Sequence, residues 1–374
     1  MATEVLPDDR ALRHGRRERA LAQMRAHDLD ILVLGRQANA RYVAGAVQLW
    51  VAGTRPFGPV AVLVRETGAV HLLSTWDEGV PEDIPHENLY GLMWNPMNTV
   101  AVLAAIDGAR TARRVGTDAL SPGFAKLLPT AFPAAEFVDG EQAMREARRV
   151  KTPEEIATLR RTLLVAEAGL AATVAALAPG TTEHGLTGVL LEAMTAGGIS
   201  TPAAQDTVWA TSPEHPWRRA DADRRVRGGD LVAVAASVLG EGYIGEVGRT
   251  WPADGAADER TRVLYRRADA LYGRLIEACR PGATATALLD AYEAEGVDLP
   301  PMPVARGLGM GFDAPVVSPH LRETAAAERL EPGMVLAVTG YVWEQGVGAV
   351  FTRDSVLITD SGPQVLTTAP HRPH

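Results

Sequence analysis

The stretch Gly229–Trp251, GDLVAVAASVLGEGYIGEVGRTW, decides the fold of this chain. Its two apolar runs, Leu231–Leu239 and Tyr243–Trp251, flank the turn signal Gly240-Glu241-Gly242. This pattern predicts a β-hairpin inside a buried sheet. The second run also carries a glutamate and an arginine among apolar side chains, and charges in such surroundings require partners.

The segment Tyr243-Ile244-Gly245-Glu246-Val247-Gly248-Arg249-Thr250 resembles a motif of the creatinase, prolidase and methionine aminopeptidase family, Tyr-x-x-Asp-x-x-Arg-Thr. The resemblance implies the pita-bread fold. In the metallopeptidase members, two aspartates of this hairpin bind metal. The matching positions in this chain are Ala235 and Glu246.

Two further segments extend the resemblance. Leu330–Val335 (LEPGMV) is similar to the Leu-x-Pro-Gly-Met-Val signature, and the two metal-binding glutamates that follow it in metallopeptidases fall on Thr339 and Arg353. In the glycine-rich segment 305–313, a metal-binding histidine falls on Arg306 and a substrate-contacting histidine on Asp313. Because a guanidinium offers no lone pair, these replacements predict that the protein holds no metal and no other cofactor.

The length of 374 residues suggests two domains. We expect residues 1–150 to form a creatinase-like α/β amino-terminal domain and residues 151–374 to form the pita-bread domain, which together make an α+β protein. Thr152-Pro153-Glu154-Glu155 has capping-box spacing and marks the start of the second domain. In the first domain, Asn39-Ala40-Arg41-Tyr42 resembles a turn of the family. Apolar periodicity and helix stop signals predict helices over these segments: Arg13–His27, Ala101–Ala109, Phe124–Leu128, 153–178, Glu183–Ala196 and Thr286–Ala294.

The amino-acid composition argues against several classes of partner. The net charge is −9 without a basic block, which argues against nucleic acid as a partner. Cys279 is the single cysteine, as expected in a reducing compartment. No apolar run approaches the length of a membrane span, so we expect a cytoplasmic protein that does not associate with membranes.

His215 is the candidate general base. It lies in the segment Thr207–Arg219, where the family resemblance places a loop histidine that is the proposed base in creatinase. A neutral imidazole takes up and returns a proton near neutral pH, and Glu246 would be its electrostatic partner. The alternative is that His215 is a loop residue stacked on Trp217 without a catalytic role.

The charged residues of the altered metal site suggest an anion-binding pocket. Arginines suit a carboxylate, which they bind through paired hydrogen bonds, so Arg306 and Arg353 are candidate clamps. Arg306 could instead pair with Asp313 or Glu246, and Glu344 could lie on a solvated rim. The further candidate substrate-binding residues are Trp217, Tyr243, Arg249, Asp313, Thr339, Glu344 and Asp354.

The leading hypothesis is a metal-independent, creatinase-like hydrolase or lyase that acts on a C–N bond of a small anionic molecule. One alternative is a pita-bread protein that binds peptides or proteins without catalysis. The other is an atypical Xaa-Pro dipeptidase with a nonstandard metal site. The resemblance also implies a homodimer in which the amino-terminal domain borders the partner's active site; the candidate residues for that contribution are Trp50, Arg55, Phe57 and Trp94.

Overall fold

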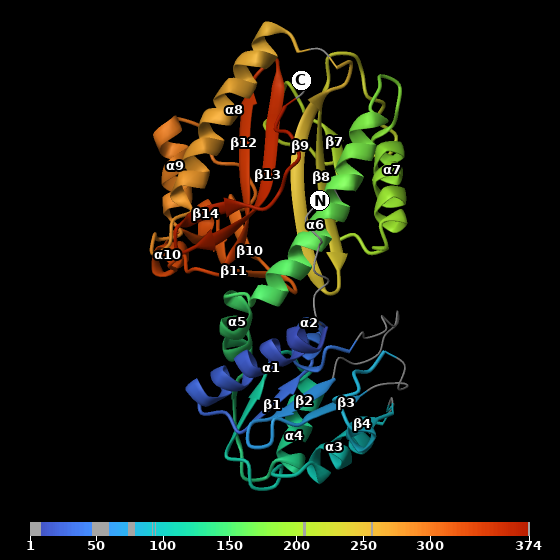
Figure 1. Cartoon of the computed structure of the whole chain (residues 1–374), viewed down its shortest axis with the longest axis vertical. Coiled ribbons are helices and arrows are strands. Elements are labelled where there is room, and N and C mark those ends of the chain that lie inside the picture. The colour runs from blue at the N-terminus through green and yellow to red at the C-terminus, as the bar shows by residue number, and fades with distance from the viewer. Residues whose placement is uncertain are drawn as a thin grey trace. The chain divides into compact units, whose positions relative to one another are not determined.

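The computed structural model describes residues 9–46, 60–73, 79–91, 93, 95–204, 207–255 and 257–372. Trp50, Arg55, Phe57 and Trp94 lie outside these ranges. The chain divides into two compact units, Met1–Glu154 and Glu155–His374, which are described separately (Figure 1).

The first unit is built on a mixed sheet, which has six strands in the described part of the unit, in the order β4-β3-β2-β1-β5-β6. β1 is antiparallel to β2 and parallel to β5, and all four of its residues are buried. The short apolar runs of the central strands explain this position, because a strand buried on both faces needs no polar alternation. The strands are β1 (Ile31–Leu34), β2 (Ala61–Val64), β3 (Val70–Leu73), β4 (Leu89–Tyr90), β5 (Arg114–Thr117) and β6 (Glu136–Asp139).

Two helices that pack on the sheet of the first unit, α3 and α4, begin at capping residues. Asn95 and Ser121 accept hydrogen bonds from backbone N–H groups in the first turns of α3 and α4, whose apolar residues pack on β1. The segment Asn39–Tyr42, expected as a turn, instead lies within the helix α2, which ends at Gly45 in the left-handed conformation. The helices are α1 (Asp9–Ala26), α2 (Gln37–Ala44), α3 (Pro96–Ala105), α4 (Pro122–Ala131), α5 (Glu141–Arg149) and the 3₁₀ turn η1 (His86–Asn88).

The second unit holds an eight-stranded sheet within its described residues, in the order β11-β10-β12-β13-β9-β8-β7, with β14 paired to β13. The long hairpins β8–β9 and β12–β13 form its centre (Figure 1). The strands are β7 (Val208–Ala210), β8 (Leu231–Gly240), β9 (Tyr243–Pro252), β10 (Ala305–Leu308), β11 (Phe312–Val317), β12 (Val335–Glu344), β13 (Gly348–Thr359) and β14 (Gly362–Val365).

The hairpin expected from the sequence is present and closes through a two-residue turn. Gly240 pairs with Tyr243, and both turn residues, Glu241 and Gly242, have positive φ angles of 49° and 84°. Turns of this kind match the twist of the strands they join. Gly245 on β9 lets α6 come close, because a Cβ there would lie 2.9 Å from Thr162 Cγ2.

Helices pack on one face of the second sheet. Residues 232, 234, 236 and 238 of β8 contact α6 and α7, whereas residues 233 and 235 face an aromatic cluster on the other side. α8 contacts β12 and β13, and α9 packs on α8. The helices are α6 (Pro153–Ala175), α7 (Glu183–Ala196), α8 (Glu259–Ala278), α9 (Ala287–Glu295), α10 (Arg322–Ala327) and the 3₁₀ turn η2 (Pro319–Leu321).

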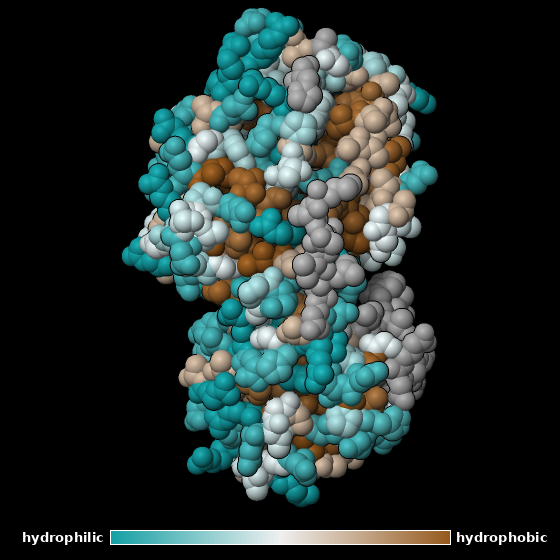
Figure 2. Space-filling view, viewed as in Figure 1, coloured by the Kyte–Doolittle hydropathy of each residue, from teal (hydrophilic) through white to brown (hydrophobic). Residues whose placement is uncertain are grey.

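The visible surface of the second unit mixes polar residues with brown apolar areas over the region of β12 and β13 (Figure 2). In the described part of the chain, no helix combines the length and apolar character that crossing a membrane requires.

The two units and their mixed helices and sheets confirm the α+β, two-domain fold expected from the sequence.

Candidate functional site

Glu246 is the centre of a charged cluster on the face of the sheet opposite the helices. Its side chain is fully buried, and Arg306 Nη2 donates to both carboxylate oxygens, at 2.6 Å to Oε1 and 2.7 Å to Oε2. Ser237 Oγ donates to Oε1 at 2.9 Å, and Arg353 Nη1 lies 3.7 Å from the same oxygen. The buried carboxylate is thus satisfied by hydrogen bonds and two positive charges.

Strand register explains why residues far apart in sequence meet here. Ser237 lies opposite Glu246 across β8 and β9, and Gly248 lies opposite both Ala235 and Arg353. Thr339 is paired with Arg353 across β12 and β13, and its hydroxyl accepts a hydrogen bond from Arg353 Nε at 3.0 Å. Directly opposed residues point to the same face of a sheet. The five positions matched to family metal ligands therefore do converge.

The positive neighbours of Glu246 keep its carboxyl group ionised. Burial raises the pKa of the Glu246 carboxyl, but Arg353, Arg306 and the Ser237 hydroxyl together outweigh burial and hold it below its ordinary value. Burial lowers the pKa of Arg353 to about 10, with Glu246 opposing this shift and Arg306 adding to it. At neutral pH, two guanidinium groups share one carboxylate.

This donor set does not fit the metal centre that a metallopeptidase requires. Of the five converging positions, only Glu246 carries a metal-binding side-chain group, and its oxygens are already engaged by Arg306 and Ser237. Arg306 and Arg353 would repel a cation. Across the residues that the structure describes, no group of three or more His, Cys, Asp and Glu side chains is placed to hold a metal ion.

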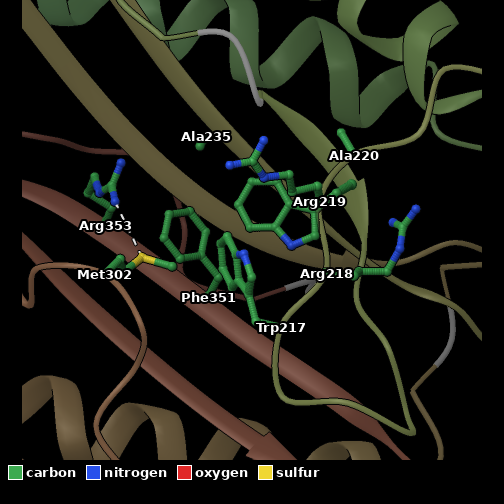
Figure 3. A pocket seen from close by; sticks show the side chains of 9 residues that line it. Trp217, Arg218, Arg219, Ala220, Ala235, Met302, Phe351 and Arg353 are labelled. Carbon is green, nitrogen blue, oxygen red and sulfur yellow. Dashed lines mark hydrogen bonds between the residues drawn. The ribbon is translucent and has the colours of Figure 1, made fainter.

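A pocket of about 160 Å³ opens beside Arg353 on the same face (Figure 3). Trp209, Trp217 and Phe351 provide aromatic walls, and neighbouring ring centroids lie 5.3 to 5.5 Å apart. The full lining is Trp209, Trp217, Arg218, Arg219, Ala220, Ala235, Met302, Phe351 and Arg353.

His215 lies on the loop that follows β7 and is exposed. Its backbone N–H donates to Ser212 Oγ at 3.1 Å, and no described residue hydrogen-bonds to its imidazole. It is not among the residues that line the pocket, although Trp217, two positions later, is. The aromatic contacts of Trp217 are with Trp209 and Tyr341, so the expected stacking of His215 on Trp217 is not found in the described chain.

Three expected substrate-binding residues, Tyr243, Arg249 and Asp354, have internal roles instead. Their alternation along the strands places them on the face opposite Glu246. The Tyr243 hydroxyl donates to Glu155 Oε1 at 2.9 Å, and Arg249 Nη2 donates to Asp354 Oδ1 at 2.7 Å. All three are at most 1 % exposed, which leaves no surface for a substrate.

The remaining candidate residues lie at different places in the second sheet. The Thr339 hydroxyl accepts a hydrogen bond from Arg353. Asp313 is buried on β11 and does not line the pocket. Glu344 lies on the helix side of β12, where its carboxylate faces Arg260 at 3.5 Å and Arg267 at 3.4 Å. Only Trp217 and Arg353 of the candidates line the pocket itself.

Several residues of the site were not predicted from the sequence. Ser237 looks like a small residue within an apolar strand, and only its position opposite Glu246 marks it. Trp209, on β7, and Arg219, on the loop that follows it, line the pocket although neither was predicted as a site residue. Glu183 is 1 % exposed and holds that loop: it accepts hydrogen bonds from the backbone N–H groups of Ala210 at 2.8 Å and Asp221 at 2.7 Å, and pairs with Arg218.

Comparison with known proteins agrees with this fold. The model of the creatinase/prolidase N-terminal domain matches residues 16–150, and that of metallopeptidase family M24 matches residues 157–360. The Xaa-Pro dipeptidase of Pyrococcus horikoshii is 23 % identical over 354 residues, which cover 92 % of this chain and 94 % of the relative. The creatinase of a Bacillus species is 25 % identical over 342 residues, covering 84 % and 81 %.

A solved structure shares the whole architecture. The prolidase from Pyrococcus horikoshii OT3 superposes with a TM-score of 0.77 at 18 % identity, covering 95 % of this chain and 99 % of the other. The match of the M24 model to more than half of the 374 residues is the decisive observation. The chain belongs to metallopeptidase family M24 and carries a creatinase/prolidase amino-terminal domain.

Proposed function

We propose that this protein is a metal-independent hydrolase that cleaves a C–N bond of a small anionic substrate bound beside Arg353. The observation that supports this proposal is that both carboxylate oxygens of Glu246 already accept hydrogen bonds, from Arg306 and Ser237. A carboxylate held in this way is an internal counter-ion and not an open metal ligand. The similarity to Xaa-Pro dipeptidases and to a creatinase supports C–N bond hydrolysis as the reaction class.

The pocket offers positive charge where a metallopeptidase would offer metal ions. A guanidinium in a site with little water stabilises negative charge that develops on a carbonyl oxygen, because it is already oriented before the reaction. Hydrolysis also needs a group that takes a proton from water and returns it to the leaving nitrogen. His215 remains our candidate for that role, as the imidazole carried by the loop that presents Trp217 to the pocket.

Elemental analysis and turnover assays together test this proposal. Protein purified without chelator is expected to contain no stoichiometric transition metal, and its turnover of small anionic amides is expected to survive treatment with EDTA. His215→Ala is expected to lower kcat by about a hundredfold or more. Two metal ions per chain, with activity lost on chelation, would overturn the proposal and favour an atypical Xaa-Pro dipeptidase.

A second candidate function is ligand binding without catalysis. It is favoured by the lining of the pocket, in which the described residues contribute arginine, aromatic, methionine and alanine side chains but no carboxylate, imidazole, hydroxyl or thiol group. Saturable binding of small anions without turnover of any amide derived from them would support this function over hydrolysis.

We also propose that the protein is a homodimer, as the family resemblance implies. Light scattering coupled to size-exclusion chromatography measures the mass directly. The mass of a single chain at micromolar concentration would contradict the dimer.

A further inference from the structure

Arg353 is a nearly buried cation that forms a long ion pair with Glu246 but no hydrogen bond from its outer nitrogens to an oxygen within the described chain. Its side chain is 9 % exposed, and its Nε donates to Thr339. Nη2 has only Met302 Sδ at 3.8 Å, while Nη1 lies 3.7 Å from the nearest Glu246 oxygen. A thioether is a weak acceptor, and 3.7 Å is too long for a hydrogen bond. Within the described chain, Nη1 and Nη2 therefore make no hydrogen bond to oxygen.

This unsatisfied edge lies at the pocket, where Arg353 and Met302 occupy one end of the lining (Figure 3). A charged donor that faces a pocket forms its strongest hydrogen bonds with a charged acceptor. A planar carboxylate is a small group whose two oxygens match two guanidinium nitrogens. The geometry at Arg353 thus suits a carboxylate.

The other cations of this region differ from Arg353 in their partners. Arg218 pairs with Glu183 at 2.5 Å and donates to the Ala210 carbonyl, and Arg306 is held by Glu246. Arg219 lines the pocket, is exposed, and has no carboxylate partner in the part of the chain that is described. Arg219 adds positive charge at the pocket without the fixed geometry of Arg353.

The rest of the pocket suits an apolar body of limited size. Trp209, Trp217 and Phe351 present ring surfaces, and Ala235 and Ala220 leave space between them. A volume of about 160 Å³ is close to that of an engineered protein cavity, about 150 Å³, that binds benzene. The space is therefore sufficient for one ring, and the aromatic walls favour stacked or edge-on contacts with it.

We propose that this pocket binds a monocarboxylate with one ring-sized apolar body, its carboxylate on Nη1 and Nη2 of Arg353 and its ring against Trp217 and Phe351. This inference rests on the proposed function, because it assigns the ligand class of the same pocket. A hydrolase built on this site would act on an amide-type derivative of such an acid.

Titration of the whole protein with three probes tests the assignment. Phenylacetate supplies ring and carboxylate, phenylacetamide supplies the ring without charge, and acetate supplies the charge without the ring. Tryptophan fluorescence reports binding, because two tryptophans line the pocket, and calorimetry gives the affinity. Phenylacetate is expected to bind at least about tenfold more tightly than either other probe, because only it makes both the charged hydrogen bonds and the ring contacts.

Two variants locate the binding. Arg353→Met removes the donors, and Ala235→Leu fills the pocket while leaving every charge in place. Each is expected to weaken phenylacetate binding by at least about tenfold. Because Arg353→Met also removes a charge beside Glu246, Ala235→Leu is the variant that decides if Arg353→Met fails to fold. Arg274→Ala, in an exposed pair with Glu295, is the matched control and should leave affinity unchanged.

Equal affinities for phenylacetate and phenylacetamide, equal affinities for phenylacetate and acetate, or undiminished binding in Ala235→Leu would each overturn the inference. Failure of the proposed function gives a different result: phenylacetate binds as expected, but no amide of a small ring-bearing acid is hydrolysed. Conversely, hydrolysis of another small anion by a protein that does not bind phenylacetate refutes the ligand class alone.

Discussion

Arg306 Nη2, on β10, lies 2.6 Å and 2.7 Å from the two carboxylate oxygens of Glu246, on β9. Glu246 is fully buried and the Arg306 side chain is 16 % exposed. A buried carboxylate with this partner stays charged, whereas the same carboxylate alone would be strongly unfavourable. The pair is therefore the contact that makes a buried, ionised Glu246 tolerable.

Removing Arg306 should destabilise the protein much more than removing an exposed arginine. Arg306→Ala leaves Glu246 with Ser237 and the more distant Arg353, and loss of one partner of a buried pair costs about 3–5 kcal/mol. Urea unfolding measures this loss. Arg274→Ala, whose pair with Glu295 is exposed, should cost less than about 1 kcal/mol. Similar losses in both variants would contradict the assigned role of Arg306.

The contribution of Glu246 to stability should depend on pH in a defined direction. Its pKa is lowered on folding, so it stabilises the folded state above its unfolded value of 4.5, and this stabilisation is lost as the pH falls below that value. The difference in free energy of unfolding between wild type and Glu246→Gln should be largest at neutral pH and shrink under acidic conditions. A difference that stays constant from pH 7 to about pH 3.5 would show that Glu246 does not titrate in this way.

The sequence predicted the central hairpin because its determinants are local: two apolar runs and a glycine-containing turn. The family resemblance also implied that Arg306 and Arg353 lie near Glu246, and both do. The expectation failed for Arg249 and Asp354, which the two-residue period of a strand assigns to the face opposite Glu246. The two-residue period of a strand holds for charged side chains as it does for apolar ones.

Other features could not be predicted because their partners are remote in the chain. Arg249 contacts the backbone of Ala369, 120 positions away, and nothing near Arg249 indicates this segment. The path of the loop that carries His215 depends on Glu183, at the start of α7. The exposure of His215 and the set of residues that line the pocket thus depend on tertiary contacts, which no local sequence pattern encodes.

Glu183 should hold the loop 211–220 in place. Its carboxylate binds both ends of that loop, through the N–H groups of Ala210 and Asp221, and pairs with Arg218. In Glu183→Gln, amide hydrogen exchange in the loop should accelerate by about tenfold or more, because a buried charged acceptor is lost. Glu214→Gln, an exposed change in the same loop, is the control. Unchanged exchange in Glu183→Gln would contradict the anchoring role.

Cys279 should be unreactive until the second unit unfolds. The thiol is fully buried, and burial raises its pKa to about 12, so little reactive thiolate forms. At pH 8, labelling by a disulfide reagent should be at least about a hundredfold slower in the native protein than in urea. Rapid labelling of the native protein would mean that the region around α8 opens readily.

Arg249 should tie the carboxyl-terminal segment 366–372 to the sheet. Its guanidinium donates to Asp354 Oδ1, to the Ala369 carbonyl at 2.7 Å and to the Pro370 carbonyl at 3.1 Å. Lysine keeps the charge but cannot reproduce this fork of donors, so Arg249→Lys should cost about 2–4 kcal/mol and expose the segment to proteolysis. Limited proteolysis followed by mass spectrometry detects the cleavage.

The control for Arg249→Lys lies in the same segment. Arg372 is 62 % exposed and lies 3.5 Å from Asp269, so Arg372→Ala should change stability by less than about 1 kcal/mol. If both variants are cleaved at similar rates, the segment is held by contacts other than Arg249. If only Arg249→Lys is cleaved, the buried arginine of the family motif acts as a structural clamp on the helix-covered face, separate from Arg306 and Arg353 on the opposite face. Charged residues a few positions apart on one strand then serve different purposes because the pleat of the sheet separates them.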